Sequence, residues 1–132
     1  MSTRATATFE TTSWDENPYD EAQGLPTLTR ASVSKTYRGD VEGEGKVEYL
    51  MMYRSDSSAT FVGLERFRGR LGGRAGSFVL QSTGTFEDGV ARSAWVVVPG
   101  SGTDELRGLR GQGEGAAGEG PPYPFTLDYE LE

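Results

Sequence analysis

The stretch that decides the fold runs Phe61-Val62-Gly63-Leu64-Glu65-Arg66-Phe67-Arg68-Gly69-Arg70. Side chains along a β-strand point alternately to its two faces, so the three arginines of this stretch share one face. Charged groups without partners are not buried together, and this face must therefore lie in solvent. The opposite face carries Phe61, Glu65 and Phe67. The stretch predicts a half-buried strand with a carboxylate among aromatic rings.

Other runs have the same strand character. Each is rich in β-branched, aromatic or alternating residues and ends at Gly, Pro, Asp or Ser. With the run at 60–67, they cover residues 6–14, 28–38, 47–53, 77–86, 90–98 and 125–131. No window repeats apolar residues at helical spacing, and only 101–109 has room for one short helical turn. Seven or eight short strands without a helix predict an all-β barrel or sandwich.

The same alternation selects the side chains that point inward from the neighbouring runs. Aromatic rings around a carboxylate would shape an apolar ligand cavity, and core packing explains them about as well. The candidate ligand-binding residues are Tyr49, Phe61, Phe67, Phe78, Ser82, Trp95 and Tyr129.

Glu65 is the catalytic candidate. In an apolar pocket it would serve as a general acid or base, or accept a hydrogen bond from a ligand. The structural alternative is a buried carboxylate that a tyrosine hydroxyl or a backbone amide satisfies. If the functional interpretation holds, Glu65→Gln keeps the fold and loses binding or turnover of the ligand.

Composition excludes several classes of function. The chain has 132 residues, which we take as one domain over 1–132, and a net charge of −7. It has no cysteine and no histidine, so a disulfide framework, a thiolate nucleophile and every His-based triad are ruled out. We expect no metal and no cofactor. The negative charge argues against nucleic-acid binding.

Two further patterns concern loops and location. Residues 113–118 match the dinucleotide pattern GxGxxG, but the flanking glycines and prolines leave no strand and helix around it, which predicts a loop.

No signal peptide or apolar span is present, so no membrane contact is expected and the predicted location is cytoplasmic.

Some aliphatic side chains fall on the outward side of their strands. They are Leu50, Met52, Val62, Leu64, Val96 and Val98. A small domain rarely exposes so many in one patch, so a loop, the C-terminal segment or a partner subunit should cover them. We expect a homo-oligomer, either a dimer or a trimer.

Several stretches resemble a known family. They include Ala7-Thr8-Phe9-Glu10, Gly76-Ser77-Phe78-Val79-Leu80-Gln81 and Gly102-Thr103 with Leu106-Arg107-Gly108-Leu109-Arg110-Gly111. The chain is similar to a bacterial family of uncharacterised function whose members form allene-oxide-cyclase-like barrels. The last stretch is also similar to one in plant allene oxide cyclases and dirigent proteins.

The resemblance implies an eight-stranded antiparallel, calycin-like barrel with a central cavity. In the plant cyclases a glutamate and the shape of the cavity steer ring closure without a cofactor, and Glu65 is the candidate for such a carboxylate. Relatives often carry histidine after the Val79-Leu80-Gln81 stretch, where this chain has Ser82. If that histidine is catalytic in the relatives, this protein has lost or altered the activity.

Two functions are therefore expected as alternatives. The first is a small-molecule-binding barrel with an apolar ligand in its cavity. The second is a cofactor-free cyclase or isomerase that folds a hydrophobic intermediate against aromatic walls, with Glu65 as acid or base.

Overall fold

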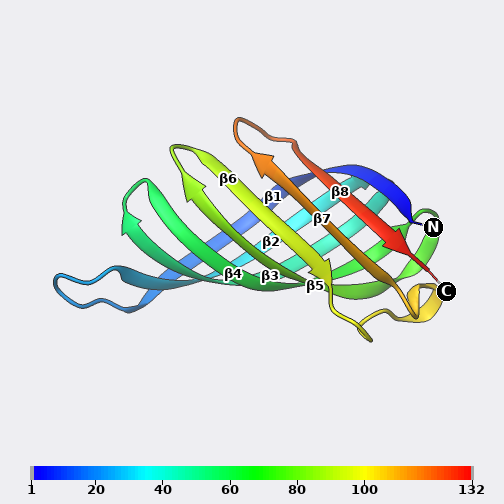
Figure 1. Ribbon diagram of the computed structural model, residues 1–132, viewed down its shortest axis with the longest axis horizontal. Coiled ribbons are helices and arrows are strands. Elements are labelled where there is room, and N and C mark those ends of the chain that lie inside the picture. Colours follow the sequence, from blue (N-terminus) through cyan, green and yellow to red (C-terminus); the bar gives the residue numbers. More distant parts are fainter. Residues whose placement is uncertain (1, 132) are drawn as a thin grey trace.

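The computed structural model describes residues 2–131 and is an antiparallel barrel (Figure 1). Each strand pairs with the next along the chain, and β8 pairs with β1 to close the wall. The strands are β1 (Thr3–Asp20), β2 (Thr27–Gly39), β3 (Val41–Ser55), β4 (Ser58–Leu71), β5 (Arg74–Glu87), β6 (Val90–Val97), β7 (Arg110–Ala117) and β8 (Tyr123–Glu130). The only helix in the described part is the single turn η1 (Asp104–Leu106). The predicted all-β, eight-stranded antiparallel barrel is confirmed. Over residues 2–131, no helix is long and apolar enough to cross a membrane.

The prediction of a loop at 113–118 was wrong, because most of this segment lies in β7. Glycine-rich composition is typical of loops, but here it provides space inside the barrel. A Cβ atom at Gly113 would lie 2.5 Å from the indole nitrogen of Trp95 and would overlap the carbonyl oxygen of Thr126. Tertiary packing, and not local propensity, makes this segment a strand.

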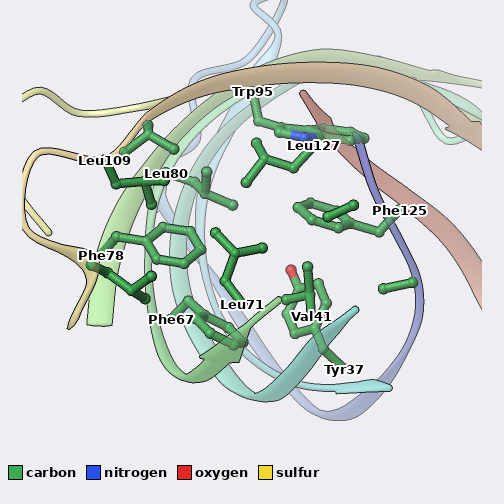
Figure 2. Packing of buried hydrophobic residues seen from close by; sticks show 14 residues of the cluster. Tyr37, Val41, Phe67, Leu71, Phe78, Leu80, Trp95, Leu109, Phe125 and Leu127 are labelled. Atoms are coloured by element: carbon green, nitrogen blue, oxygen red, sulfur yellow. The ribbon is translucent and has the colours of Figure 1, made fainter. Parts of the chain in front are cut away.

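One end of the barrel is closed by side chains. The connection from β6 to β7, which includes η1, folds back along β5, and the Thr103 amide donates to the Ser77 carbonyl at 2.9 Å. It brings Leu106 and Leu109 into the barrel interior. We call the buried side chains of this half the closed-end cluster (Figure 2). Its members are Ala5, Ala7, Tyr37, Val41, Phe67, Leu71, Phe78, Leu80, Trp95, Val97, Leu106, Leu109, Phe125 and Leu127.

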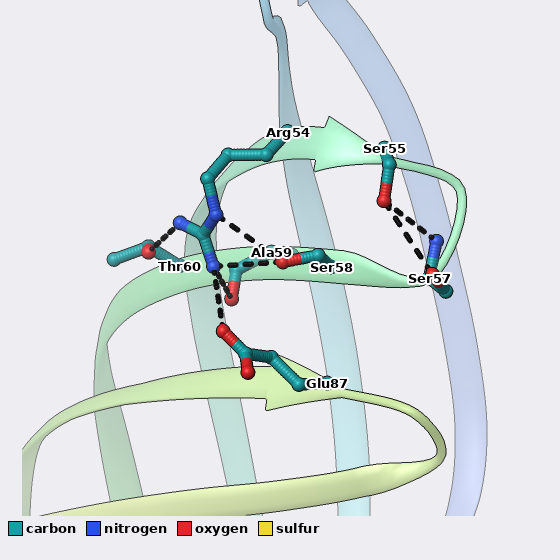
Figure 3. A network of polar contacts seen from close by, with 7 residues as sticks. All are labelled: Arg54, Ser55, Ser57, Ser58, Ala59, Thr60 and Glu87. Carbon is teal, nitrogen blue, oxygen red and sulfur yellow. Dashed lines mark hydrogen bonds and ion pairs between the residues drawn. The ribbon is translucent and has the colours of Figure 1, made fainter.

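The hairpins that join β1–β2, β3–β4, β5–β6 and β7–β8 surround the opposite, open end (Figure 1). A second group of buried side chains lies here, which we call the open-end cluster. Its members are Ala31, Val33, Val47, Tyr49, Met51, Ala59 and Phe61. At the rim, the Arg54 guanidinium of β3 donates to the Thr60 hydroxyl at 2.6 Å and pairs with Glu87 of β5 at 3.4 Å (Figure 3). These exposed contacts tie three neighbouring strands together at the mouth.

Candidate functional site

A cavity of about 450 Å³ lies at the open end of the barrel. Its walls are mainly aromatic and aliphatic. They include Phe9, Trp14, Tyr49, Met51, Phe61, Phe86 and Ala91. Besides the tyrosine hydroxyls, its polar side chains are Thr11, Lys35, Asp56 and Ser93, of which Lys35 and Asp56 are charged. Small-molecule sites in proteins typically measure about 300–1,000 Å³ and combine an apolar wall with a few polar groups. This outer cavity has both properties.

A smaller space of about 40 Å³ continues from the outer cavity toward the closed end. The two spaces share lining residues and therefore lie end to end. The shared residues are Phe9, Lys35, Tyr49, Ser93 and Ala117. The inner cavity adds the polar side chains of Tyr37, Glu65 and Ser82. About 10–15 Å³ is enough for one water molecule, so this space admits water or a single polar group of a ligand.

Lys35 and Glu65 form a buried ion pair at the inner cavity. The Lys35 Nζ lies 3.3 Å from Glu65 Oε1, and the two side chains are only 11% and 2% exposed. Lys35 also donates a hydrogen bond to the Tyr49 hydroxyl at 2.9 Å, and the Tyr37 hydroxyl donates to Glu65 Oε2 at 2.5 Å. Tyr37 belongs to the closed-end cluster and Tyr49 to the open-end cluster. This polar array therefore connects the two halves of the core.

Gly45 makes room for the carboxylate of the pair. It lies opposite Lys35 in the β2–β3 register, so its missing side chain leaves a space beside the ion pair. A Cβ atom at this position would overlap Glu65 Oε2 and come within 3.1 Å of a Tyr37 ring carbon. The sequence of β3 thus allows Glu65 and Tyr37 to meet inside the barrel.

The environment keeps both proton donors of the array protonated. Burial alone would lower the pKa of Lys35, but the charge of Glu65 and the contacts with Tyr49 outweigh it and raise that pKa. Burial raises the pKa of Tyr37 well above its ordinary value, and the charge of Glu65 raises it further. Lys35 is therefore a charged hydrogen-bond donor at neutral pH and not a free amine nucleophile.

A second carboxylate, Glu16, fastens the β1–β2 hairpin to the rim of the outer cavity. It accepts hydrogen bonds from the Thr29 hydroxyl at 2.5 Å, the Tyr53 hydroxyl at 2.6 Å and the Trp14 indole at 2.9 Å. Partial burial opposes its ionisation, but these three bonds outweigh that effect and lower the pKa of Glu16. Burial and the bond to Glu16 raise the pKa of Tyr53 to about 12. We call these four residues the rim clamp.

The barrel wall is weakly paired between β7 and β8. Only Arg110, Gly111 and Gln112 of β7 pair with β8, although β7 continues to Ala117. Beyond this point the Trp95 indole of β6 donates to the Thr126 carbonyl of β8 at 2.9 Å. Residues of both separated strand segments, including Gly115 and Phe125, line the inner cavity. The polar array therefore lies beside the least hydrogen-bonded part of the wall.

The structure brings together five of the eight residues that the sequence nominated. Tyr49 lines both cavities, Phe61 lines the outer one, and Glu65, Ser82 and Trp95 line the inner one. The other three line neither. Phe67 and Phe78 pack against each other in the closed-end cluster with ring centroids 5.0 Å apart, and Tyr129 packs against that cluster. Core packing, which the sequence left open as the alternative, accounts for these three.

Glu65 has contacts that both interpretations of it require. The structural interpretation needs a tyrosine hydroxyl, and Tyr37 supplies one. The functional interpretation needs access to a cavity, and Glu65 lines the inner one. In the part of the chain that the structure describes, no group of three or more acidic side chains is placed to hold a metal ion.

The sequence analysis missed Lys35 and the rim clamp. Lys35 lies two residues from Val33 and two from Tyr37, both buried, so alternation along residues 28–38 could have identified it as an inward-facing lysine. No local pattern marks the rim clamp, because Glu16 and Tyr53 come from β1 and β3 and meet only in the folded barrel.

The fold and this site define a closed eight-stranded β-barrel with an apolar cavity and an ion pair at its base. The chain belongs to the family described as "Protein of unknown function (DUF3224)", whose sequence model matches residues 5–129. It is similar to a crystal structure of a DUF3224 protein of unknown function from Shewanella oneidensis MR-1. The two are 32% identical with a TM-score of 0.82, over 100% of this chain and 98% of the other. No curated protein matches this chain.

Proposed function

We propose that this barrel binds a small, largely apolar molecule in the cavity at its open end. The observation that carries the proposal is the outer cavity of about 450 Å³ and its aromatic lining. Phe61 of the open-end cluster and Phe9 border this space, and the side chain of Trp14 stacks on Tyr49 with ring centroids 6.3 Å apart. A molecule placed there would bury apolar surface that water otherwise covers, which favours binding.

A larger hollow of about 720 Å³ lies on the outside of the barrel, over β5, β6, β7 and β8. Its lining is mostly polar and includes Gln81, Gln112 and Glu114. Such a surface is well solvated and gives an apolar molecule little to bury. The inner side of the barrel is therefore the better site for this class of ligand.

Two alanines of β6 allow a matched test of the two locations. Ala91 lines the outer cavity, whereas Ala94 lines the hollow on the outside of the barrel. We expect Ala91→Phe to fill the cavity and to abolish binding of a naphthalene-based fluorescent probe, and Ala94→Phe to leave it unchanged. The reverse pattern would place the ligand outside the barrel and contradict the proposal. Mass spectrometry of solvent extracts from the native protein would then identify the natural ligand.

The polar array favours a second candidate, the cofactor-free cyclase or isomerase. The likeness of the segment from Gly102 to Gly111 to allene oxide cyclases points the same way. Glu65 lines the inner cavity, and each of its carboxylate oxygens accepts one hydrogen bond, from Tyr37 or from Lys35, so in this candidate Glu65 is the acid or base. Chiral analysis of the ring-closed product from a reactive fatty epoxide tests it. An enzyme would give one enantiomer in excess, and a racemic product equal to the buffer control would contradict it.

The outward aliphatic patch supports the proposed homo-oligomer. Leu50, Val62, Leu64 and Val96 are between 43% and 56% exposed. No described segment of the same chain covers these four, so the intramolecular cover that the sequence left open does not apply to them. We propose that a second copy of the chain covers this patch. Light scattering should give a dimer or trimer mass at micromolar concentration, and a monomer mass would contradict it.

A further inference from the structure

Lys35 has donor capacity that the protein does not use. Its ammonium group has three hydrogens, and two of them bond the Tyr49 hydroxyl and Glu65 Oε1. The Phe9 ring also lies near this nitrogen, with its centroid 4.7 Å away, and no third acceptor among residues 2–131 bonds it. Lys35 and Phe9 both line the inner and the outer cavity. The third hydrogen is therefore available to a molecule in the cavity.

Tyr49 supplies a second donor at the same place. Its hydroxyl oxygen accepts the hydrogen bond from Lys35, and its own hydrogen has no acceptor among the described residues. Tyr49 also lines both cavities. Two donors thus converge where the outer cavity narrows into the inner one, and one acceptor atom of a ligand could receive bonds from both.

The charges around this point favour an acceptor without a net charge. Glu65 already neutralises Lys35, and its carboxylate would lie close to a bound anion. Glu16 and Asp56 add negative charge at the mouth, and the whole chain carries −7. A cationic group would compete with Lys35 for Glu65, and it offers the two donors no acceptor. An uncharged oxygen avoids both penalties and the cost of bringing a charge out of water.

We propose that the barrel selects an uncharged carbonyl compound, whose carbonyl oxygen accepts hydrogen bonds from Lys35 Nζ and Tyr49 while its apolar body fills the outer cavity. This inference rests on the proposed function and names the ligand class for the same site. Lys35 and Tyr49 are then specificity-determining residues. Because Lys35 stays protonated, the contact is a hydrogen bond and not a covalent imine.

Two probes of equal shape test the inference. Methyl naphthyl ketone and isopropenyl naphthalene differ only in an oxygen that replaces a methylene group. By calorimetric titration, the ketone should bind about tenfold more tightly, which corresponds to roughly one good hydrogen bond. The carbonyl stretching band of the bound ketone should move to lower frequency. The anion naphthoate should bind more weakly than the ketone.

Variants assign the effect to the two donors. Tyr49→Phe should remove most of the ketone's advantage and leave the affinity for the alkene unchanged. Tyr19→Phe is the control, because Tyr19 is exposed on the β1–β2 hairpin. Lys35→Met is combined with Glu65→Gln, so that no charge stays buried alone, and this double variant should also lose the advantage. Lys46→Met, on the outer face of β3, should change nothing.

The outcomes separate this inference from the proposed function. If the ketone and the alkene bind the wild type equally well, or Tyr49→Phe weakens both to the same extent, the carbonyl selection is wrong while the binding function stands. Tighter binding of naphthoate would also overturn the selection of an uncharged ligand. If none of the probes binds, the proposed function fails together with the inference.

Discussion

The closed and open ends of the barrel use the same strands for different purposes. In the closed-end cluster, Phe67, Phe78 and Leu106 are at most 1% exposed and fill the interior. In the open-end cluster, Phe61 and Tyr49 are 8% and 9% exposed because they border a cavity. One half of the barrel therefore supplies tight packing, and the other half keeps a space. The comparison shows a packed half and a half with a cavity along the barrel axis, with the polar array between them. Under the proposed function, stability and ligand binding are therefore separable.

The largest expected effect comes from breaking the link between the two ends. If Glu65 were buried without a partner, Glu65→Gln would remove an unfavourable charge and stabilise the fold. Glu65 instead neutralises Lys35, so the substitution leaves the Lys35 ammonium buried without a counter-charge. We expect the free energy of unfolding to fall by about 3–5 kcal/mol, as for other broken buried pairs. Urea denaturation measures the loss.

A double variant provides the control for this loss. Combining Lys35→Met with Glu65→Gln removes both charges and should recover much of the stability. Glu44→Gln, on the exposed face of β3, should have little effect. If Glu65→Gln were as stable as the wild type, the ion pair would not hold the two halves together.

Truncation at each end sharpens the comparison directly. Leu106→Ala leaves a void in a filled interior and should cost about 2–5 kcal/mol. Phe61→Ala only enlarges an existing cavity and should cost less. Binding of the naphthalene probe should change in the opposite order, retained in Leu106→Ala and weakened in Phe61→Ala. Equal effects on binding at the two ends would show that the site is not confined to the open end.

The weakly paired part of the wall gives a smaller, position-specific effect. A methyl group at Gly113 would overlap Thr126 and Trp95, whereas one at Gly115 would meet Trp95 at an ordinary contact distance of 3.4 Å. We expect Gly113→Ala to destabilise the fold by about 1–3 kcal/mol, as overpacking does, and Gly115→Ala to be close to neutral. Thermal unfolding of the pair measures the difference. Equal melting temperatures would mean that Trp95 does not need the space at Gly113.

The smallest expected effect is a pH dependence confined to the open end. Because the pKa of Glu16 is lowered from 4.5, its bonds contribute stability above that pH, and the contribution is lost as pH falls through the lowered value. The indole N–H signal of Trp14 in NMR spectra should therefore shift as the pH falls below 4.5, while methyl signals of Leu71 and Leu106 stay constant. In Glu16→Gln this pH-dependent shift of the Trp14 signal should disappear. If the pH-dependent shift of the Trp14 signal persists in this variant, an acid other than Glu16 causes the shift.

Much of the fold could be predicted from alternation alone. The arginines of residues 61–70 correctly predicted which face of that strand points to solvent. Phe61, Glu65 and Trp95 lie inside the barrel, as their positions in the alternation indicated. The strand at β7 could not be predicted in this way, because its glycines match a loop and their role depends on the Trp95 side chain from another strand. The polar array was predicted only in part. The carboxylate stood out among aromatic residues, but its partners Lys35 and Tyr37 lie about 30 residues earlier on β2.

The most direct test of the proposed binding site at the open end is an NMR titration of the isotope-labelled protein with methyl naphthyl ketone. We predict saturable shifts of the amide signals of Lys35, Tyr49 and Phe61, with the signals of Leu71, Phe78 and Leu106 unchanged. Saturable shifts confined to the outer face, at Gln81, Ala94 and Gln112, would contradict the account, and so would the absence of any saturable shift.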